Sequence, residues 1–213
     1  MNREIYVSDF IKNNIKSQNF PGYPACNLMY YIVLTTLKRS NNVILETGSF
    51  HGISTAVIAQ AVEDLSLRIG LYNSAFRNIS TTEELPFKSN IYSIEIDKSA
   101  YDKAVENMKL SGLNTHVTFI HGDSKIEIPK LLETITQLDF AFLDSDHSFN
   151  GIYTEFNLIK NIVKASNGYM YFDNTEAGGV NDALVRIKAE NDCNLIRFPL
   201  CSYSPPGQAL LHF

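Results

Sequence analysis

The stretch VILETGSFHGIST (Val43–Thr55) joins a short apolar run to two glycines, Gly48 and Gly52, and then to the hydroxyls of Ser54 and Thr55 at the start of an apolar-periodic segment. This order predicts a strand, a tight turn and the N-terminus of a helix. A helix N-terminus offers free backbone N–H groups, and glycines let a ligand approach the main chain. The stretch therefore indicates a nucleoside-type cofactor, although such a turn also occurs without any ligand.

The composition predicts one globular domain over residues 1–213, because the chain is 45% hydrophobic and 19% charged. A net charge of −5 without a Lys/Arg cluster argues against a nucleic-acid partner. The longest apolar run, Leu28–Leu37, is too short to cross a bilayer, and Met1–Asn14 lacks a signal-peptide core, so we expect no membrane partner and a cytoplasmic location. Three cysteines without CxxC spacing favour reduced thiols.

Strand-like runs alternate with helical periodicity on both sides of the opening stretch. The expected strands are Val43–Leu45, a strand from Ile91, Val117–Ile120, Leu138–Asp144, Tyr169–Thr175 and a terminal pair around NLIRFPL and GQALLHF. The expected helices are Ile5–Lys16 and Asn27–Lys38 in an N-terminal helical segment (1–40), Gly52–Leu65, one from Asp97 to Gly112, one through Leu131 and Ile135, Ile152–Ala165 and Val180–Glu190. The alternation predicts an α/β fold with a doubly wound, mainly parallel seven-stranded sheet and a terminal antiparallel strand pair.

Residues 66–90 interrupt this pattern with glycine, asparagine and hydroxyl residues. The segment is longer than an ordinary connection, so it predicts an insertion of about one supersecondary element. It joins the end of a helix to the start of a strand, at the edge of the sheet opposite the expected ligand. We therefore expect it to serve in a homo-oligomer contact or as structural padding.

Polar groups follow five predicted strands at their carboxyl ends. They are Glu46 and Gly48, then Glu95, then Asp123 and Ser124, then Asp144, Asp146 and His147, and finally Asp173 and Asn174. Ligands of open α/β sheets bind beyond these ends, so we expect the set to converge on one site. A helix cap or a turn explains Asp97, Asp146 and Ser124 at least as well when each is taken alone.

Two subsets of these residues indicate ligands. Glu95 has the chemistry to accept two hydrogen bonds from a ribose diol, although it lies further from Gly48 than the roughly 20 residues typical of a dinucleotide site. Asp144, Asp173 and Asn174 are short oxygen donors that suit a hard cation such as Mg²⁺ better than zinc. An Asp-Asn pair is also a common turn former.

These motifs together resemble the class I S-adenosylmethionine-dependent methyltransferases, and within them the cation-dependent O-methyltransferases of the catechol and caffeoyl-coenzyme A kind. The resemblance covers roughly Asn27 to the C-terminus and is carried by ETGSFHGIST, SIEID, GDS, FLDSDH and YFDNT. It implies a Rossmann-like methyltransferase fold with S-adenosylmethionine as cofactor. The cofactor residues that it implies are Glu46, Gly48, Phe50, Gly52, Ser54, Glu95, Asp123 and Ser124.

The same resemblance implies that Asp144, Asp173 and Asn174 hold Mg²⁺ or a similar cation, and that Asp144 and His147 are catalytic. His147 stands where those families have a lysine. The DxDHS wording is closer to bacterial O-methyltransferases that act on sugars and secondary metabolites. The implied acceptor is therefore a hydroxyl of a small molecule, either phenolic and catechol-like or a sugar or secondary metabolite.

Three alternatives stay open at this point. The first is an NAD(P)-dependent oxidoreductase on the same kind of sheet, although the glycines are spaced GxxxG and not GxGxxG. The second is a non-catalytic cofactor-binding module. The third concerns His147 alone, which a surface position in a helix-leading loop explains equally well. For the acceptor pocket we expect the N-terminal segment, residues 145–151, 176–179 and 201–206, with aromatic walls from Tyr23, Phe149 and Tyr203.

Overall fold

The computed structural model describes residues 23–37, 41–76, 88–199 and 206–213. Its centre is a seven-stranded sheet in the order β3-β2-β1-β4-β5-β7-β6. The strands are β1 (Asn41–Thr47), β2 (Lys88–Glu95), β3 (Val117–His121), β4 (Phe140–Leu143), β5 (Tyr169–Phe172), β6 (Asn194–Phe198) and β7 (Gln208–His212). Neighbours from β3 through β5 are parallel, and β7 is antiparallel to both β5 and β6. This confirms the predicted sheet and its terminal antiparallel pair.

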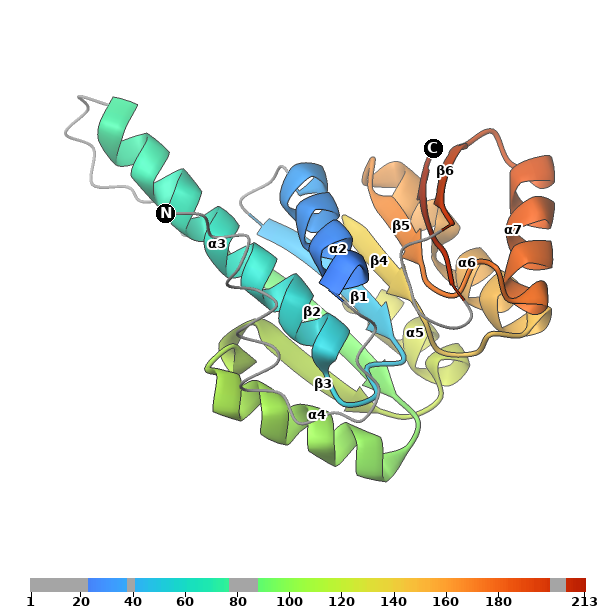
Figure 1. Cartoon of the computed structure of the whole chain (residues 1–213), viewed down its shortest axis with the longest axis horizontal. Helices are drawn as coiled ribbons and strands as arrows, with labels where there is room; N and C mark the ends of the chain where they lie inside the picture. The colour runs from blue at the N-terminus through green and yellow to red at the C-terminus, as the bar shows by residue number, and fades with distance from the viewer. Residues whose placement is uncertain (1–22, 38–40, 77–87, 200–205) are drawn as a thin grey trace.

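Helices cover both faces of the sheet (Figure 1). One face carries α2 (Tyr23–Thr36), α3 (Ile53–Phe76) and α4 (Lys98–Ser111), and the other carries α5 (Ser124–Leu132), α6 (Phe149–Ala165) and α7 (Gly178–Glu190). Each layer has its own apolar core against the sheet. Because both faces are covered, β4 is apolar throughout, and all four of its residues, Phe140–Leu143, are completely buried. The architecture is doubly wound, as predicted.

Side chains at the end of β1 point alternately to the two faces of the sheet, so this strand contacts the helices on both faces. Glu46 and Thr47 are consecutive strand residues, so they point to opposite faces of the sheet. Glu46 accepts a hydrogen bond from Thr55 on the α3 side, whereas Thr47 donates one to Glu155 on the α6 side. The strand order reverses between β1 and β4, which makes this end of the sheet a topological switch point.

The predicted helix Gly52–Leu65 is longer in the structure and continues into the segment 66–90. Helix α3 has 24 residues and runs on to Phe76, projecting beyond the sheet (Figure 1), and β2 begins at Lys88. The chain has no proline between Ile53 and Pro86, and a glycine inside a helix, here Gly70, costs only about 1 kcal/mol. The loss of apolar periodicity therefore marks where the helix leaves the sheet. Residues 77–87 and the predicted helix Ile5–Lys16 lie outside the described residues.

Local capping signals explain several element ends. Asp97 accepts a hydrogen bond from the backbone N–H of Ala100 at 2.7 Å and caps α4, as predicted. Gly112 ends the same helix in a left-handed conformation. The predicted second helix, Asn27–Lys38, in fact begins at Tyr23, with Pro24 in its first turn, where a proline is tolerated. Among the described residues, the helices are too short or too polar to span a membrane.

Candidate active site

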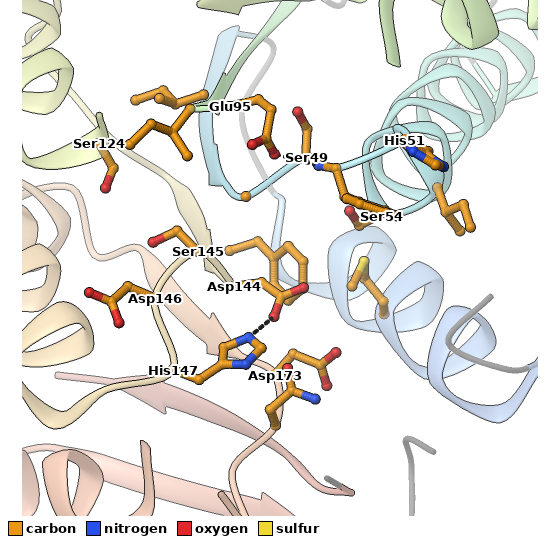
Figure 2. Close-up of a pocket in the computed structure, with 18 of the residues that line it drawn as sticks. Ser49, His51, Ser54, Glu95, Ser124, Asp144, Ser145, Asp146, His147 and Asp173 are labelled. Atoms are coloured by element: carbon orange, nitrogen blue, oxygen red, sulfur yellow. Dashed lines mark hydrogen bonds and ion pairs between the residues drawn. The ribbon is translucent and has the colours of Figure 1, made fainter. Parts of the chain in front are cut away.

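A cleft of about 1050 Å³ lies beyond the carboxyl ends of β1, β2, β4 and β5, at the switch point (Figure 2). This volume suits a nucleoside cofactor together with a small second molecule. Of the predicted site residues, the cleft brings together Gly48, Phe50, Ser54, Glu95, Asp123, Ser124, Asp144, His147, Asp173 and Asn174. Glu46 and Gly52 are not among the described residues that line it. The expected convergence of strand-end residues is thus largely observed.

The glycine loop is shaped by packing within the protein. Gly48 has φ +80°, and a Cβ there would lie 2.3 Å from the backbone oxygen of Asp144. Gly52 also has φ +80°, and its Cβ would lie 3.2 Å from the Cα of Ala104 on α4. The sequence interpretation explained both glycines by ligand approach. The structure gives another reason, which is the close contact of the loop with the end of β4 and with α4.

Glu95 connects the glycine loop to the end of β2. Its Oε2 accepts a hydrogen bond from the backbone N–H of Phe50 at 2.7 Å, and its Oε1 accepts one from that of Asp97 at 2.8 Å. Phe50 has φ 45°, which is uncommon for a residue with a side chain. Each carboxylate oxygen can accept a further bond, so both are available to hydroxyl groups of a ligand. This residue fits the ribose of a nucleoside cofactor.

Glu46 lies beneath the glycine loop and has a structural role there. It is completely buried, and its Oε2 accepts hydrogen bonds from the hydroxyls of Thr55 at 2.5 Å and Ser93 at 2.6 Å. Burial raises the pKa of Glu46 above its ordinary value, and these hydroxyls oppose the shift only in part. The carboxyl group therefore ties β1 to β2 and α3 beneath the loop.

Three titratable side chains lie together at the other end of the cleft (Figure 2). The Nε2 atom of His147 is 3.1 Å from the Oδ1 of Asp144. The hydrogen bond with Asp144 raises the pKa of His147, and burial raises that of Asp144. Asp173 is 7% exposed, and burial together with the charge of Asp144 raises its pKa to about 7. Two neighbouring carboxylates in a poorly hydrated place repel each other.

The surroundings of Asp173 bear on the predicted cation. Among the described residues its Oδ1 has no hydrogen-bond partner, and the next residue, Asn174, adopts φ 53°. Gln208 forms a hydrogen bond with Asp173 and accepts another from the hydroxyl of Tyr171 at 2.5 Å. Within the described part of the chain, no group of three His, Cys, Asp or Glu side chains is arranged to hold a metal ion. The predicted set contains two carboxylates and one amide, and its oxygen donors fit a hard cation.

The start of α5 also lines the cleft. Asp123 caps this helix, and its Oδ1 accepts a hydrogen bond from the backbone N–H of Lys125 at 2.9 Å. Lys125 extends to Asp146 across the rim, where Nζ and Oδ2 are 3.0 Å apart. Asp123 thus lies in the cleft and also performs the capping role that acids commonly take at this position.

Sequence reasoning missed several residues of the site. Ala25, Cys26 and Met29 of α2 line the cleft, as expected for the N-terminal segment, but the sequence did not single out these three residues. Gln208 and Glu155 lie outside the sequence motifs but form hydrogen bonds with residues of the site. Glu155 could have been noticed in the sequence as an acid on the apolar face of α6. Phe149 stacks on Tyr153 and is not among the described lining residues.

The rest of the expected acceptor pocket is only partly visible. Residues 176–179 are not among the described lining residues, and 201–205 lie outside the described residues, as does the side chain of Tyr23. Three further histidines, His116, His121 and His212, are likewise not among the described lining residues. Of the segments expected at the acceptor pocket, those whose described residues line the cleft are α2 and the loop after β4.

The sequence of the chain is similar to those of known methyltransferases. The chain is 30% identical over 155 residues to tapetum-specific methyltransferase 1 of Arabidopsis thaliana, covering 72% of this chain and 55% of that protein. It is 28% identical over 117 residues to a caffeoyl-CoA O-methyltransferase of Stellaria longipes, covering 54% of this chain and 47% of that protein. The chain spans about half the length of the curated relatives it matches.

Solved structures share the fold. The O-methyltransferase from Bacillus cereus in complex with SAH aligns over 100% of this chain and 90% of its own, with a TM-score of 0.67 and 15% identity. The O-methyltransferase TomG from Streptomyces achromogenes, in complex with SAM, aligns over 100% of this chain and 89% of its own, with a TM-score of 0.67 and 15% identity.

The family itself is shown by a profile described as Methyltransferase domain, which matches residues 45–175, more than half of the 213 residues. The matched segment runs from β1 through the residues after β5, and so contains both ends of the cleft. The resemblance inferred from the motifs is thereby confirmed, and the chain belongs to the methyltransferase domain family.

Proposed function

We propose that the protein is an S-adenosylmethionine-dependent O-methyltransferase that methylates a hydroxyl of a small molecule. The observation that carries the proposal is a single cleft with Glu95 and the glycine loop at one end and Asp144, His147 and Asp173 at the other. Family membership and relatives named as caffeoyl-CoA O-methyltransferases support the reaction class. Methyl transfer needs donor and acceptor held in line, which one cleft with two differently equipped ends can provide.

The cofactor would supply a methyl group on a positively charged sulfur. Glu95 would accept hydrogen bonds from the ribose hydroxyls, and Phe50 and Ser54 would contact the remainder on the α3 side. Asp123 and Ser124 would border the adenine. Glu46 and Gly52 would contribute by holding the loop, since neither is among the described lining residues.

At the acceptor end, we propose a divalent cation held by Asp144, Asp173 and Asn174. A cation there would lower the pKa of a bound hydroxyl and offset the repulsion between the two carboxylates. His147 would take the released proton or orient the acceptor. Its ring is hydrogen-bonded to Asp144, and 44% of its side-chain surface is exposed. The Oδ1 of Asp173, which has no hydrogen-bond partner within the described part of the chain, supports this assignment.

Calorimetry and a substrate panel test the proposal. S-Adenosylhomocysteine should bind with micromolar or better affinity, and NAD should not bind. Methylation of a catechol, phenolic acid or glycoside with Mg²⁺ present should stop when a chelator is added in excess. Binding of NAD in place of S-adenosylhomocysteine would support an oxidoreductase. Binding of S-adenosylhomocysteine without turnover of any acceptor would support a non-catalytic module.

A further inference from the structure

Glu155 is a completely buried carboxylate on an otherwise apolar face of α6. Its neighbours on that face, Ile152, Phe156 and Ile159, are also completely buried. Burial raises the pKa of Glu155 above its ordinary value, which shows that the ionised form is disfavoured there. An apolar side chain would fill the position at less cost, so the carboxylate has to serve something that an apolar residue cannot.

Three hydroxyls from separate parts of the chain converge on this carboxylate. Thr47 at the end of β1 donates to Oε2 at 3.0 Å, and Ser145 in the loop between β4 and α6 donates to Oε1. Ser124, the first residue of α5, also hydrogen-bonds to Glu155 and lowers its pKa. One acceptor therefore joins β1, α5 and the loop that follows β4.

Two of these three donors belong to the wall of the cleft. Ser124 and Ser145 line it, as Figure 2 shows, whereas Thr47 and Glu155 are not among the described lining residues. Ser124 follows Asp123 on the side expected to border the adenine, and Ser145 follows Asp144. Glu155 thus acts from behind the wall on two residues that line the cleft.

We propose that Glu155 is a positioning residue that fixes the hydroxyls of Ser124 and Ser145 and thereby sets the affinity for the cofactor. The inference rests on the proposed cofactor site. With the carboxylate present, both hydroxyls and the two segments that carry them are ordered before the ligand arrives. Without the carboxylate, the hydroxyls and their segments become ordered only when the ligand binds. The free-energy cost of this ordering then lowers the affinity.

Calorimetry with S-adenosylhomocysteine at 25 °C tests the role. Glu155→Gln keeps the size of the side chain but removes one of the two hydrogen-bond-accepting oxygens. We expect its Kd to rise about three- to tenfold, as for the loss of one or two hydrogen bonds. Thr47→Ala is the matched control, because it removes a bond to the same carboxylate away from the cleft. It should lower the Tm and leave the Kd within twofold.

A double-mutant cycle separates positioning from general destabilisation. Ser145→Ala should weaken binding in the wild-type background and change the Kd by less than twofold in the Glu155→Gln background, because the hydroxyl is no longer held there. Additive effects would overturn the proposal. If Glu155→Gln is unfolded at 25 °C, Glu155→Asp can replace it, because the shorter side chain moves the carboxylate away from the two serine hydroxyls. An unchanged Kd in folded Glu155→Asp would also overturn the proposal.

The cofactor site and the positioning role fail in different ways. A wild-type protein that does not bind S-adenosylhomocysteine contradicts the proposed function itself. A wild-type protein that binds it, with Glu155→Gln binding equally well at a reduced Tm, contradicts only the positioning role and makes Glu155 a structural residue.

Discussion

Glu95 combines two tasks in one carboxylate. Its two oxygens accept backbone hydrogen bonds from Phe50 and Asp97, so it holds the glycine loop against β2, and the same oxygens border the cleft. A ligand with two adjacent hydroxyls would therefore meet an acceptor whose orientation is already fixed. Such preorganisation lowers the entropic cost of binding.

Replacing Glu95 with glutamine should weaken binding of S-adenosylhomocysteine. The variant loses the charge and one acceptor, and hydrogen bonds to charged groups contribute roughly 1.5–3 kcal/mol, so we expect the Kd to rise about tenfold or more. Calorimetry measures the change. Glu106→Gln, on the exposed side of α4, is the control and should bind like the wild type. An unchanged Kd for Glu95→Gln would remove Glu95 from the cofactor site.

Asp173 provides the test of the cation. If Mg²⁺ binds the folded protein, the Tm should rise with its concentration, by the equivalent of about 2.7 kcal/mol at 100 times the Kd. Asp173→Asn should abolish this dependence and keep S-adenosylhomocysteine binding. Asp102→Asn, on the exposed face of α4, should respond like the wild type. A wild-type Tm that responds to none of Mg²⁺, Mn²⁺ and Ca²⁺ would contradict the metal assignment.

At the scale of elements, the junction of β1 and α3 depends on its fit against the end of β4. Gly48 and Gly112 both have positive φ, at +80° and +74°, but only Gly48 has other atoms in the space that a Cβ would occupy, as far as the described residues show. The two glycines therefore separate backbone strain from steric overlap.

Gly112→Ala should lower the free energy of unfolding by about 1–2 kcal/mol, the cost of a left-handed conformation for a residue with a side chain. Gly48→Ala should cost about 1–3 kcal/mol more, because its Cβ would lie 2.3 Å from the backbone oxygen of Asp144. Urea denaturation of both variants measures the difference. Equal losses would mean that the loop can move away from β4 without cost.

The buried Glu46 predicts a pH dependence for the contact among β1, β2 and α3. Its pKa in the folded protein is raised by burial and, to a smaller extent, by Glu95. Above pH 4.5 or so the unfolded chain releases this proton while the folded protein retains it, so the stability linked to Glu46 falls as pH rises toward the folded pKa. Glu46→Gln does not titrate.

The glutamine variant should therefore gain stability relative to the wild type as the pH rises above about 4.5. Urea unfolding of both proteins at several pH values gives the difference. A constant difference between Glu46→Gln and the wild type over this range would contradict the raised pKa of Glu46.

At the scale of the whole molecule, the reversal of strand order between β1 and β4 divides the cleft. Residues after β1 and β2 lie at one end, where we propose the cofactor, and residues after β4 and β5 lie at the other end, where we propose the acceptor. The two ends meet because parallel strands finish at the same edge of the sheet, although their residues are far apart in the chain.

Hydrogen exchange should report these two ends separately. S-Adenosylhomocysteine should slow exchange at residues 48–52 and 95–97, and Mg²⁺ should slow it at 144–148 and 173–175. The edge strand β6 provides an internal control and should be unchanged, because it lies at the end of the sheet furthest from β3. Protection of 173–175 by the nucleoside alone would mean that the division between the ends is wrong.

The sequence by itself determined the elements and their order. Apolar runs alternating with helical periodicity, and caps such as Asp97, depend on neighbours in the chain, and these parts of the prediction were confirmed. It also identified the strand-end residues, because the carboxyl edge of a parallel sheet follows from the alternation of strands and helices. The length of α3 was not predictable, since apolar periodicity is lost once a helix leaves the sheet.

Only the tertiary structure decided which of those residues face the cleft. Glu46 lies one residue from Thr47 and two from Gly48, yet it is buried under the loop, because alternation along β1 directs it toward α3. Glu155 is 108 positions from Thr47 and accepts a hydrogen bond from it on the face of the sheet that α6 covers. A sequence pattern records spacing along the chain, whereas contacts of this kind arise from the packing of helices on a particular strand order.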